Sequence, residues 1–208
     1  MEHINYLVIL MAALVAVASP GPATLAITSV AINQGRAHGI MLAIGIWCGS
    51  LFWSCTAAFG LGAVMSANIW LFEILRYAGA GYLLFLAYKA AFSAVRGKTL
   101  QTANIATASL PKSYLKGLAI HLTNPKAILF FSALYAIGVP HHIGVAGLLK
   151  VIAVVALQSG VIFVGYALLF STQKARAMYL KLNRAFDIVF GTFFGIAGVK
   201  VLMSRLNN

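Results

Sequence analysis

Two proline motifs interrupt long apolar segments of this sequence, one in each half of the chain. The motifs are Ser19-Pro20-Gly21-Pro22, inside the apolar run 4–32, and Asn124-Pro125-Lys126, inside the run 115–139. A proline inside a helix removes a backbone donor and frees a carbonyl about one turn earlier. In hydrocarbon, such freed groups must face protein or a water-filled cavity. Paired interruptions of this kind indicate a binding site for a small molecule near the centre of a membrane transporter.

The first motif predicts a site for a carboxylate. It should unwind the helix and leave main-chain N–H groups at the start of the next half-helix, at Ala23. A helix N-terminus carries partial positive charge and attracts anions. Thr24 would add a hydroxyl donor at the same place. A plain proline kink is the alternative, but a Pro-Gly-Pro sequence preceded by Ser19 favours a binding site.

The second motif places a positive charge deep in an apolar run. Lys126 is close to the middle of its run, where a lysine is costly unless it faces a cavity or a partner. Its natural role is to hold a carboxylate, from either a substrate or a protein acid; its depth argues against snorkelling to the interface. His121 lies on the same helical face as Asn124. It is either a proton carrier, given an unperturbed pKa of about 6.5, or a packed, hydrogen-bonded residue.

Acidic residues are rare, and two of the three stand beside an arginine. Glu73 and Arg76 begin the third apolar run, while Arg184 and Asp187 begin the sixth, with the order of acid and base reversed. This pattern predicts two gates that close alternately on opposite sides of a membrane. The alternative is an ordinary pair at each helix start, which contributes only about 0.2–0.5 kcal/mol when solvated.

The elements that must position these residues are membrane helices. The chain has 208 residues, of which 62% are hydrophobic and 9% charged, whereas soluble domains average about 25% charged residues. Lipid must therefore solvate most of the surface, and about 20 residues suffice to cross the hydrocarbon. The apolar runs predict six spans, at 4–32, 39–65, 69–92, 115–139, 143–171 and 184–203.

These spans predict an all-α membrane protein with one transporter domain covering 1–208. The polar stretch 93–113 reads as a linker between repeat one, at about 1–95, and repeat two, at about 114–208. Three spans per half force the second half to enter the membrane inverted, which makes an inverted repeat with proline-broken first and fourth helices.

Two pairs of glycines have the small-xxx-small spacing that lets membrane helices approach closely. The pairs are Gly45 with Gly49 and Gly191 with Gly195. Packing within the chain is the favoured interpretation, and a homodimer face is the alternative.

The formal net charge of +12 reflects basic residues in the connections after the first, third and fifth spans. They are Arg36, then Lys89, Arg96, Lys98, Lys112 and Lys116, then Lys174, Arg176, Lys181 and Arg184. The positive-inside rule places these connections in the cytoplasm and both termini outside. Anionic lipid headgroups are the expected partners of this charge, and nucleic acid is not.

The first apolar run lacks the positive n-region of a signal peptide and is expected to remain as a span.

Three stretches resemble the LysE-type amino-acid exporter family, particularly its homoserine/threonine-resistance branch. They are Ser19 to Pro22, Ala78 to Ala90 and Gly117 to Phe131. The resemblance covers essentially the whole chain and implies a six-span inner-membrane protein that exports amino acids against protons.

The chain also departs from that family's pattern. His121 stands where the family commonly has Asn, and 133–138 replaces a Pro-Gln-Phe-like turn. The second span lacks the acid of the lysine-exporting branch, which argues against a basic substrate.

The leading prediction is export of small or neutral amino acids by alternating access, coupled to protons carried by His121, Glu73 or Asp187. The substrate carboxylate would meet the half-helix starts near Ala23 and Lys126, and freed carbonyls would take its ammonium.

The alternatives are an intramembrane thiol redox protein or a cation exporter. The redox protein would need a reactive cysteine in each half, but Cys48 and Cys55 share one predicted helix; a cation exporter would need more acids or thiolates. We expect no metal, no cofactor and no enzyme activity, because no activated nucleophile or metal spacing occurs in the sequence.

Overall fold

A computed structural model describes residues 6–19, 21–67, 69–96, 109–139 and 143–203. Within these ranges every regular element is a helix. The helices are α1 (Tyr6–Ala18), α2 (Pro22–Asn33), α3 (Arg36–Ala67), α4 (Ile69–Arg96), α5 (Leu110–Leu122), α6 (Pro125–Gly138), α7 (Val145–Leu169) and α8 (Gln173–Met203).

The two proline motifs separate α1 from α2 and α5 from α6. The axes of α1 and α2 differ by 51°. Pro22 and Pro125 each occupy the first position of a new helix, where the missing N–H would have no partner in the helix anyway. The chain therefore breaks each helix just before its proline and starts the next helix on it. Pro20 lies outside the described residues.

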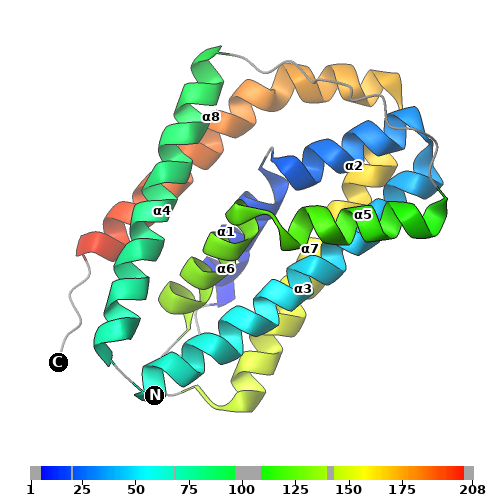
Figure 1. Ribbon diagram of the computed structural model, residues 1–208. Helices are drawn as coiled ribbons and strands as arrows, with labels where there is room; N and C mark the ends of the chain where they lie inside the picture. The colour runs from blue at the N-terminus through cyan, green and yellow to red at the C-terminus, as the bar shows by residue number, and fades with distance from the viewer. Residues whose placement is uncertain (1–5, 20, 68, 97–108, 140–142, 204–208) are drawn as a thin grey trace.

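The helices form two groups with the breaks between them (Figure 1). Helices α4 and α8 pack along each other on one side, and α3 packs against both α5 and α7 on the other. Helix α6 contacts α4 and α3, and α1 contacts α7 and α6, so these half-helices occupy the centre. The two breaks consequently face each other in the middle of the molecule (Figure 1).

Glycines allow the closest helix crossings. A Cβ atom at Gly45 would lie 2.0 Å from the carbonyl oxygen of Tyr114, and one at Gly117 would lie 2.1 Å from that of Leu42. A Cβ atom at Gly191 would likewise lie 3.4 Å from the Ala87 carbonyl oxygen and from Ala90 Cβ, both of α4. Packing within one chain thus accounts for these glycine faces, the interpretation favoured over a dimer face.

Helix α7 is apolar on both its inner and its outer side. Val151, Val155 and Phe163 are buried, while Leu157 and Val161 are 70% and 67% exposed. A helix that is hydrophobic all round is typical of a membrane span.

Two described helical stretches are long and apolar enough to cross a membrane, namely Arg36–Gly60 and Val145–Leu169. A third is added if α1 and α2 are counted as one bent span. Shorter apolar stretches cover Ala80–Phe92, Pro125–Ala136 and Asp187–Ile196. The fold is therefore all-helical with two or three candidate spans, where the sequence predicted six.

The last helix starts earlier than predicted. The sequence placed the sixth span at 184–203 and a loop before it, but α8 begins at Gln173. Lysine and arginine are good helix formers, so a cluster of basic residues can continue a helix beyond its apolar part. Arg184 and Asp187 therefore lie inside a long helix and not in its first turn, which corrects that prediction.

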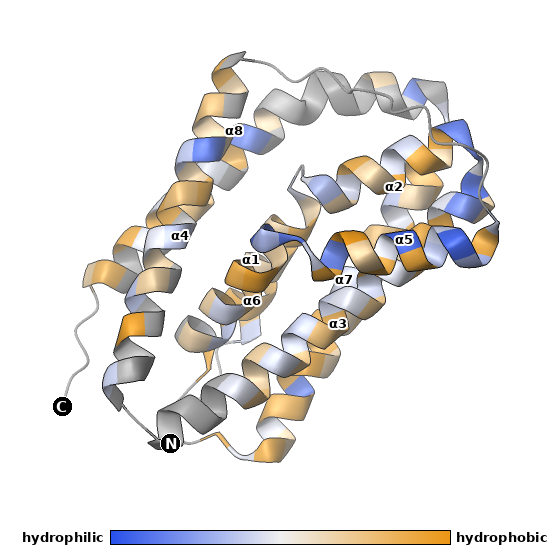
Figure 2. Ribbon diagram, in the orientation of Figure 1, coloured by the Kyte–Doolittle hydropathy of each residue, from blue (hydrophilic) through white to orange (hydrophobic). Residues whose placement is uncertain are grey.

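Hydrophilic residues gather at the end of the molecule where α2 meets α3, α5 begins and α7 meets α8 (Figure 2). Lys112, Lys116 and Lys174 are exposed at this end. Arg36 Nε donates to Ser171 Oγ at 3.3 Å, which joins the connection after α2 to the connection after α7. The connections after α2 and α7 and the start of α5, which the sequence predicted to be on one side of a membrane, thus lie together.

Candidate binding site at the two helix breaks

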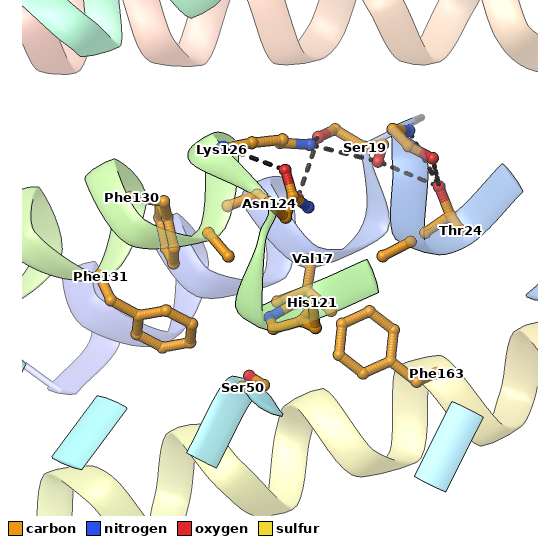
Figure 3. A pocket seen from close by; sticks show the side chains of 14 residues that line it. Val17, Ser19, Thr24, Ser50, His121, Asn124, Lys126, Phe130, Phe131 and Phe163 are labelled. Atoms are coloured by element: carbon orange, nitrogen blue, oxygen red, sulfur yellow. Dashed lines mark hydrogen bonds between the residues drawn. The ribbon is translucent and has the colours of Figure 1, made fainter. Parts of the chain in front are cut away.

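Residues from both breaks line one small cavity at the centre of the molecule (Figure 3). Its polar wall consists of Ser19, Gly21, Thr24, Ser50, His121, Asn124 and Lys126, and its apolar wall of Ala16, Val17, Ala23, Ala127, Phe130, Phe131 and Phe163. Six of the nine predicted binding residues are therefore brought together. Pro22 and Pro125 are exposed and do not belong to the lining, and Pro20 is outside the described part of the chain.

Lys126 links the two halves of the chain across this cavity. Its ammonium donates to Ser19 Oγ and, at 3.4 Å, to the Ser19 carbonyl oxygen. The aliphatic part of the side chain runs over Gly21, where an added Cβ would lie 3.6 Å from Lys126 Cδ. The lysine thus reaches from the start of α6 to the end of α1 (Figure 3).

The carbonyls freed at the first break are already hydrogen-bonded. Pro22 cannot donate to the Ala18 carbonyl one turn earlier, and Tyr166 of α7 donates to this oxygen instead, at 2.6 Å. The Ser19 carbonyl is taken by Lys126. The sequence predicted that freed carbonyls hold a substrate ammonium, but here side chains from the second half of the chain hold them.

The two half-helix starts differ in how many of their first N–H groups already have a partner next to them in the chain. At α6, Asn124 caps the helix, because its side chain accepts from the Lys126 N–H at 3.0 Å and its carbonyl accepts from the Ala127 N–H at 2.9 Å. At α2 the N-cap is Gly21, which has no side chain to offer. Ala23, in the first turn of α2, has no preceding turn to accept its N–H group. The start of α2 is consequently the more open anion site.

The Thr24 hydroxyl serves the turn in which it lies. It accepts from the Gly21 N–H at 3.0 Å and lies within hydrogen-bond distance of the Gly21 and Ser19 carbonyls, at 3.2 and 3.5 Å. Thr24 is 1% exposed. It therefore stabilises the unwound segment, a role that the sequence did not predict.

His121 is buried at the end of α5, with 5% of its surface exposed. Its ring contacts that of Phe163 edge to face, with the centroids 5.8 Å apart. Neither ring nitrogen has a hydrogen-bond partner among the described residues. The ring is therefore packed in this structure, and a role as proton carrier stays a prediction.

Helices α3 and α7 supply residues that sequence reasoning missed. Ser50 of α3 and Phe163 of α7 line the cavity, and Tyr166 completes the first break. Ser50 follows Gly49 and is a polar residue within an apolar helix, a signal that could have been read. Nothing in the sequence around Phe163 or Tyr166 distinguishes them from ordinary apolar helix residues.

Among the predicted gating residues, Asp187 is the one whose side chain the structure describes. Asp187 is buried in α8, at 3% exposure, and does not line this cavity. The side chains of Glu73, Arg76 and Arg184 lie outside the described residues. The two gates therefore remain a prediction.

The cavity is small. Its volume is about 40 Å³, whereas pockets for small molecules measure about 300–1,000 Å³. This volume admits a few water molecules but not an amino acid. A cavity of this size would have to widen to hold an amino acid.

Comparison with known proteins gives consistent matches over most of the chain. Residues 14–205 match the family described as LysE type translocator. The threonine efflux protein of Salmonella typhi is 29% identical over 202 residues, which cover 96% of this chain and 98% of that protein. The threonine efflux protein of Escherichia coli strain K12 is 27% identical over the same length. A leucine efflux protein of Salmonella choleraesuis is 31% identical over 132 residues, or 64% of this chain and 62% of that protein. No solved structure matches the chain significantly.

Proposed function

The chain belongs to the LysE type translocator family, and we propose that it exports small neutral amino acids across the cytoplasmic membrane. One observation carries this proposal: two helix breaks from opposite halves of the chain line a single buried cavity. Broken helices that meet at one site are how many secondary transporters bind substrate. The efflux proteins that resemble the chain are named for threonine and leucine, both neutral amino acids.

The lining explains how a zwitterion would be held. A substrate carboxylate would approach the first turn of α2 at Ala23 and attract the Lys126 ammonium away from Ser19. The Ser19 carbonyl and hydroxyl, which now accept from Lys126, would then be free for the substrate ammonium. One rearrangement of one side chain would thus prepare both charged subsites.

The charge of the lining favours a neutral side chain. Among the described residues that line the cavity, Lys126 carries a charge and none is an acid. A lysine or arginine substrate would bring a second positive charge without a carboxylate to pair it, which is costly in a buried site.

We extend this to a carrier that works by alternating access, with six spans in two inverted repeats at about 1–95 and 114–208. The order of the helices supports it, because a broken pair followed by two longer helices occurs twice, as α1 to α4 and α5 to α8. The basic end marked by Arg36, Lys112 and Lys174 would face the cytoplasm, so both termini would be outside. A homodimer in a lipid bilayer is compatible with this arrangement.

Export would be coupled to protons. His121, Glu73 and Asp187 are the candidate carriers, and the pairs of Glu73 with Arg76 and Arg184 with Asp187 are the candidate gates. Burial of Asp187 inside an apolar helix supports a functional role, because an acid in such a place is costly. A thiol redox function is disfavoured because Cys48 and Cys55 both lie in α3, in one half of the chain.

The test is counterflow in proteoliposomes with a panel of labelled amino acids. Neutral amino acids should exchange, and Lys126→Ala should reduce the exchange at least about tenfold, which corresponds to losing about 1.4 kcal/mol of binding. Lys150→Ala is the matched control, because Lys150 is an exposed lysine of α7 outside the cavity. Exchange of no amino acid, or full activity of Lys126→Ala, would contradict the proposal.

A further inference from the structure

The imidazole of His121 is a buried polar group whose hydrogen bonds are unmade. Nδ1 and Nε2 are both inaccessible to solvent and both lack a partner among the described residues. A neutral imidazole carries one donor and one acceptor. Buried polar groups in folded proteins nearly always have a hydrogen-bond partner. Two ring nitrogens without one, on the wall of a cavity, therefore indicate that a bound ligand supplies the partner.

The surrounding residues hold the ring in place. Phe163 contacts it edge to face, with an angle of 73° between the ring planes. Gly49 lets the backbone of α5 come so close that a Cβ there would lie 2.9 Å from His121 Cβ. The histidine is therefore fixed between α3 and α7.

The position of the ring separates it from the charged subsites. Ser19, Thr24 and Lys126 form one end of the cavity, while His121 and Ser50 lie away from that end, beside Phe131 and Phe163 (Figure 3). An amino acid whose carboxylate and ammonium meet Lys126 and Ser19 would point its side chain toward His121. That side chain would lie among apolar residues, with His121 and Ser50 as the hydrogen-bonding groups on one side.

We propose that His121, assisted by the Ser50 hydroxyl, is the residue that selects the substrate by its side chain, and that it selects a hydroxyl over an aliphatic group. The inference rests on the proposed function, since it concerns the same site. A substrate hydroxyl can donate to the unprotonated ring nitrogen or accept from the protonated one. An aliphatic side chain of the same shape would leave the imidazole unpaired, and sites built to bind a hydroxyl discriminate strongly against such analogues.

Threonine and valine provide the test, because they have the same shape and differ by a hydroxyl in place of a methyl group. In counterflow with wild-type protein, threonine should be preferred by about tenfold or more in kcat/KM, the ratio expected for one net hydrogen bond. His121→Phe keeps an aromatic ring but has no polar atom, and it should bring the ratio to within about twofold while valine is still carried. His121→Asn retains a donor and an acceptor and should keep part of the preference.

His38→Phe is the matched control, since His38 lies near the start of α3 and does not line the cavity. Its ratio of threonine to valine kcat/KM should equal that of the wild type. Equal transport of threonine and valine by the wild type would overturn the assignment of His121, and so would an unchanged ratio in His121→Phe. The first of these readouts needs no variant and holds even if His121→Phe does not fold. Both outcomes would leave the proposed function intact, whereas transport of neither amino acid would contradict the proposed function itself.

Discussion

The Tyr166 hydroxyl supplies the donor that Pro22 lacks. It reaches the Ala18 carbonyl from α7, at 2.6 Å, and so bonds the oxygen that a helical residue at position 22 would have bonded. Lys126 does the same for the next carbonyl, at Ser19. Two side chains of the second half of the chain therefore stabilise the unwound segment of the first half.

Tyr166→Phe should destabilise the protein without changing its shape. Loss of the hydroxyl leaves the partly buried Ala18 carbonyl without this donor, which costs about 1–3 kcal/mol. For a chain of this size each kcal/mol lowers Tm by about 2–4 °C. Thermal unfolding in detergent should show this drop for Tyr166→Phe and none for Tyr88→Phe, because Tyr88 is 65% exposed. Equal values of Tm for the two variants would remove Tyr166 from this role.

At this scale the sequence predicted the residues of the proline motifs but not their partners. Proline, glycine and an intramembrane lysine are informative because each is costly in a helix within hydrocarbon. Tyr166 and Phe163 are ordinary in an apolar helix, and only the packing of α7 against α1 and α5 gives them a role. The present partners of the freed carbonyls, Tyr166 and Lys126, were not predicted for the same reason, and binding of a substrate ammonium by these carbonyls stays a prediction.

The helices themselves depend on close contact between backbones. The crossing of α3 with α5 has Gly45 and Gly117 at its centre, each facing a carbonyl of the other helix. This crossing also brings His121 against Gly49. The position of one cavity wall is therefore set by residues that have no side chain.

Gly117→Ala should separate α3 from α5. The new methyl group would lie 2.1 Å from the Leu42 carbonyl oxygen and 2.9 Å from its carbon, and backbone atoms cannot move aside as a side chain can. The expected cost is about 1–3 kcal/mol, as for other overpacked sites. Gly165→Ala is the matched control, because nothing lies within 4 Å of its new Cβ; it should raise stability by about 0.5–1 kcal/mol. If Gly117→Ala melts no lower than Gly165→Ala, the crossing is looser than described.

Element boundaries were predictable where an apolar run ends at a turn residue. They were unpredictable where basic residues extend a helix beyond its apolar run. The runs 143–171 and 69–92 correspond closely to α7 and α4. The start of α8 at Gln173 was missed because lysine and arginine end an apolar run without ending a helix.

For the whole molecule, the proposed orientation follows from the basic end. Arg36 and Ser171 join the connections after α2 and α7 there, and the first turn of α5 belongs to the same end (Figure 2). Helix α7 begins at the other end (Figure 1).

Cysteine labelling tests this orientation. In a variant with Cys48 and Cys55 replaced by serine, Val145→Cys should react with an impermeant maleimide in intact cells, since Val145 is 63% exposed and would face outward. Lys112→Cys should react only after the cells are permeabilised. The reverse pattern would place the termini in the cytoplasm and contradict the positive-inside assignment.

In the proposed alternating-access cycle, the contact of Lys126 with Ser19 would serve the return step. Without a substrate, the Lys126 ammonium already donates to the Ser19 hydroxyl and carbonyl oxygens that a substrate ammonium would otherwise occupy. The empty carrier would therefore keep these buried acceptors bonded while it changes between its outward-open and inward-open forms. Such a carrier would return without an amino acid from outside, which suits net export of a metabolite.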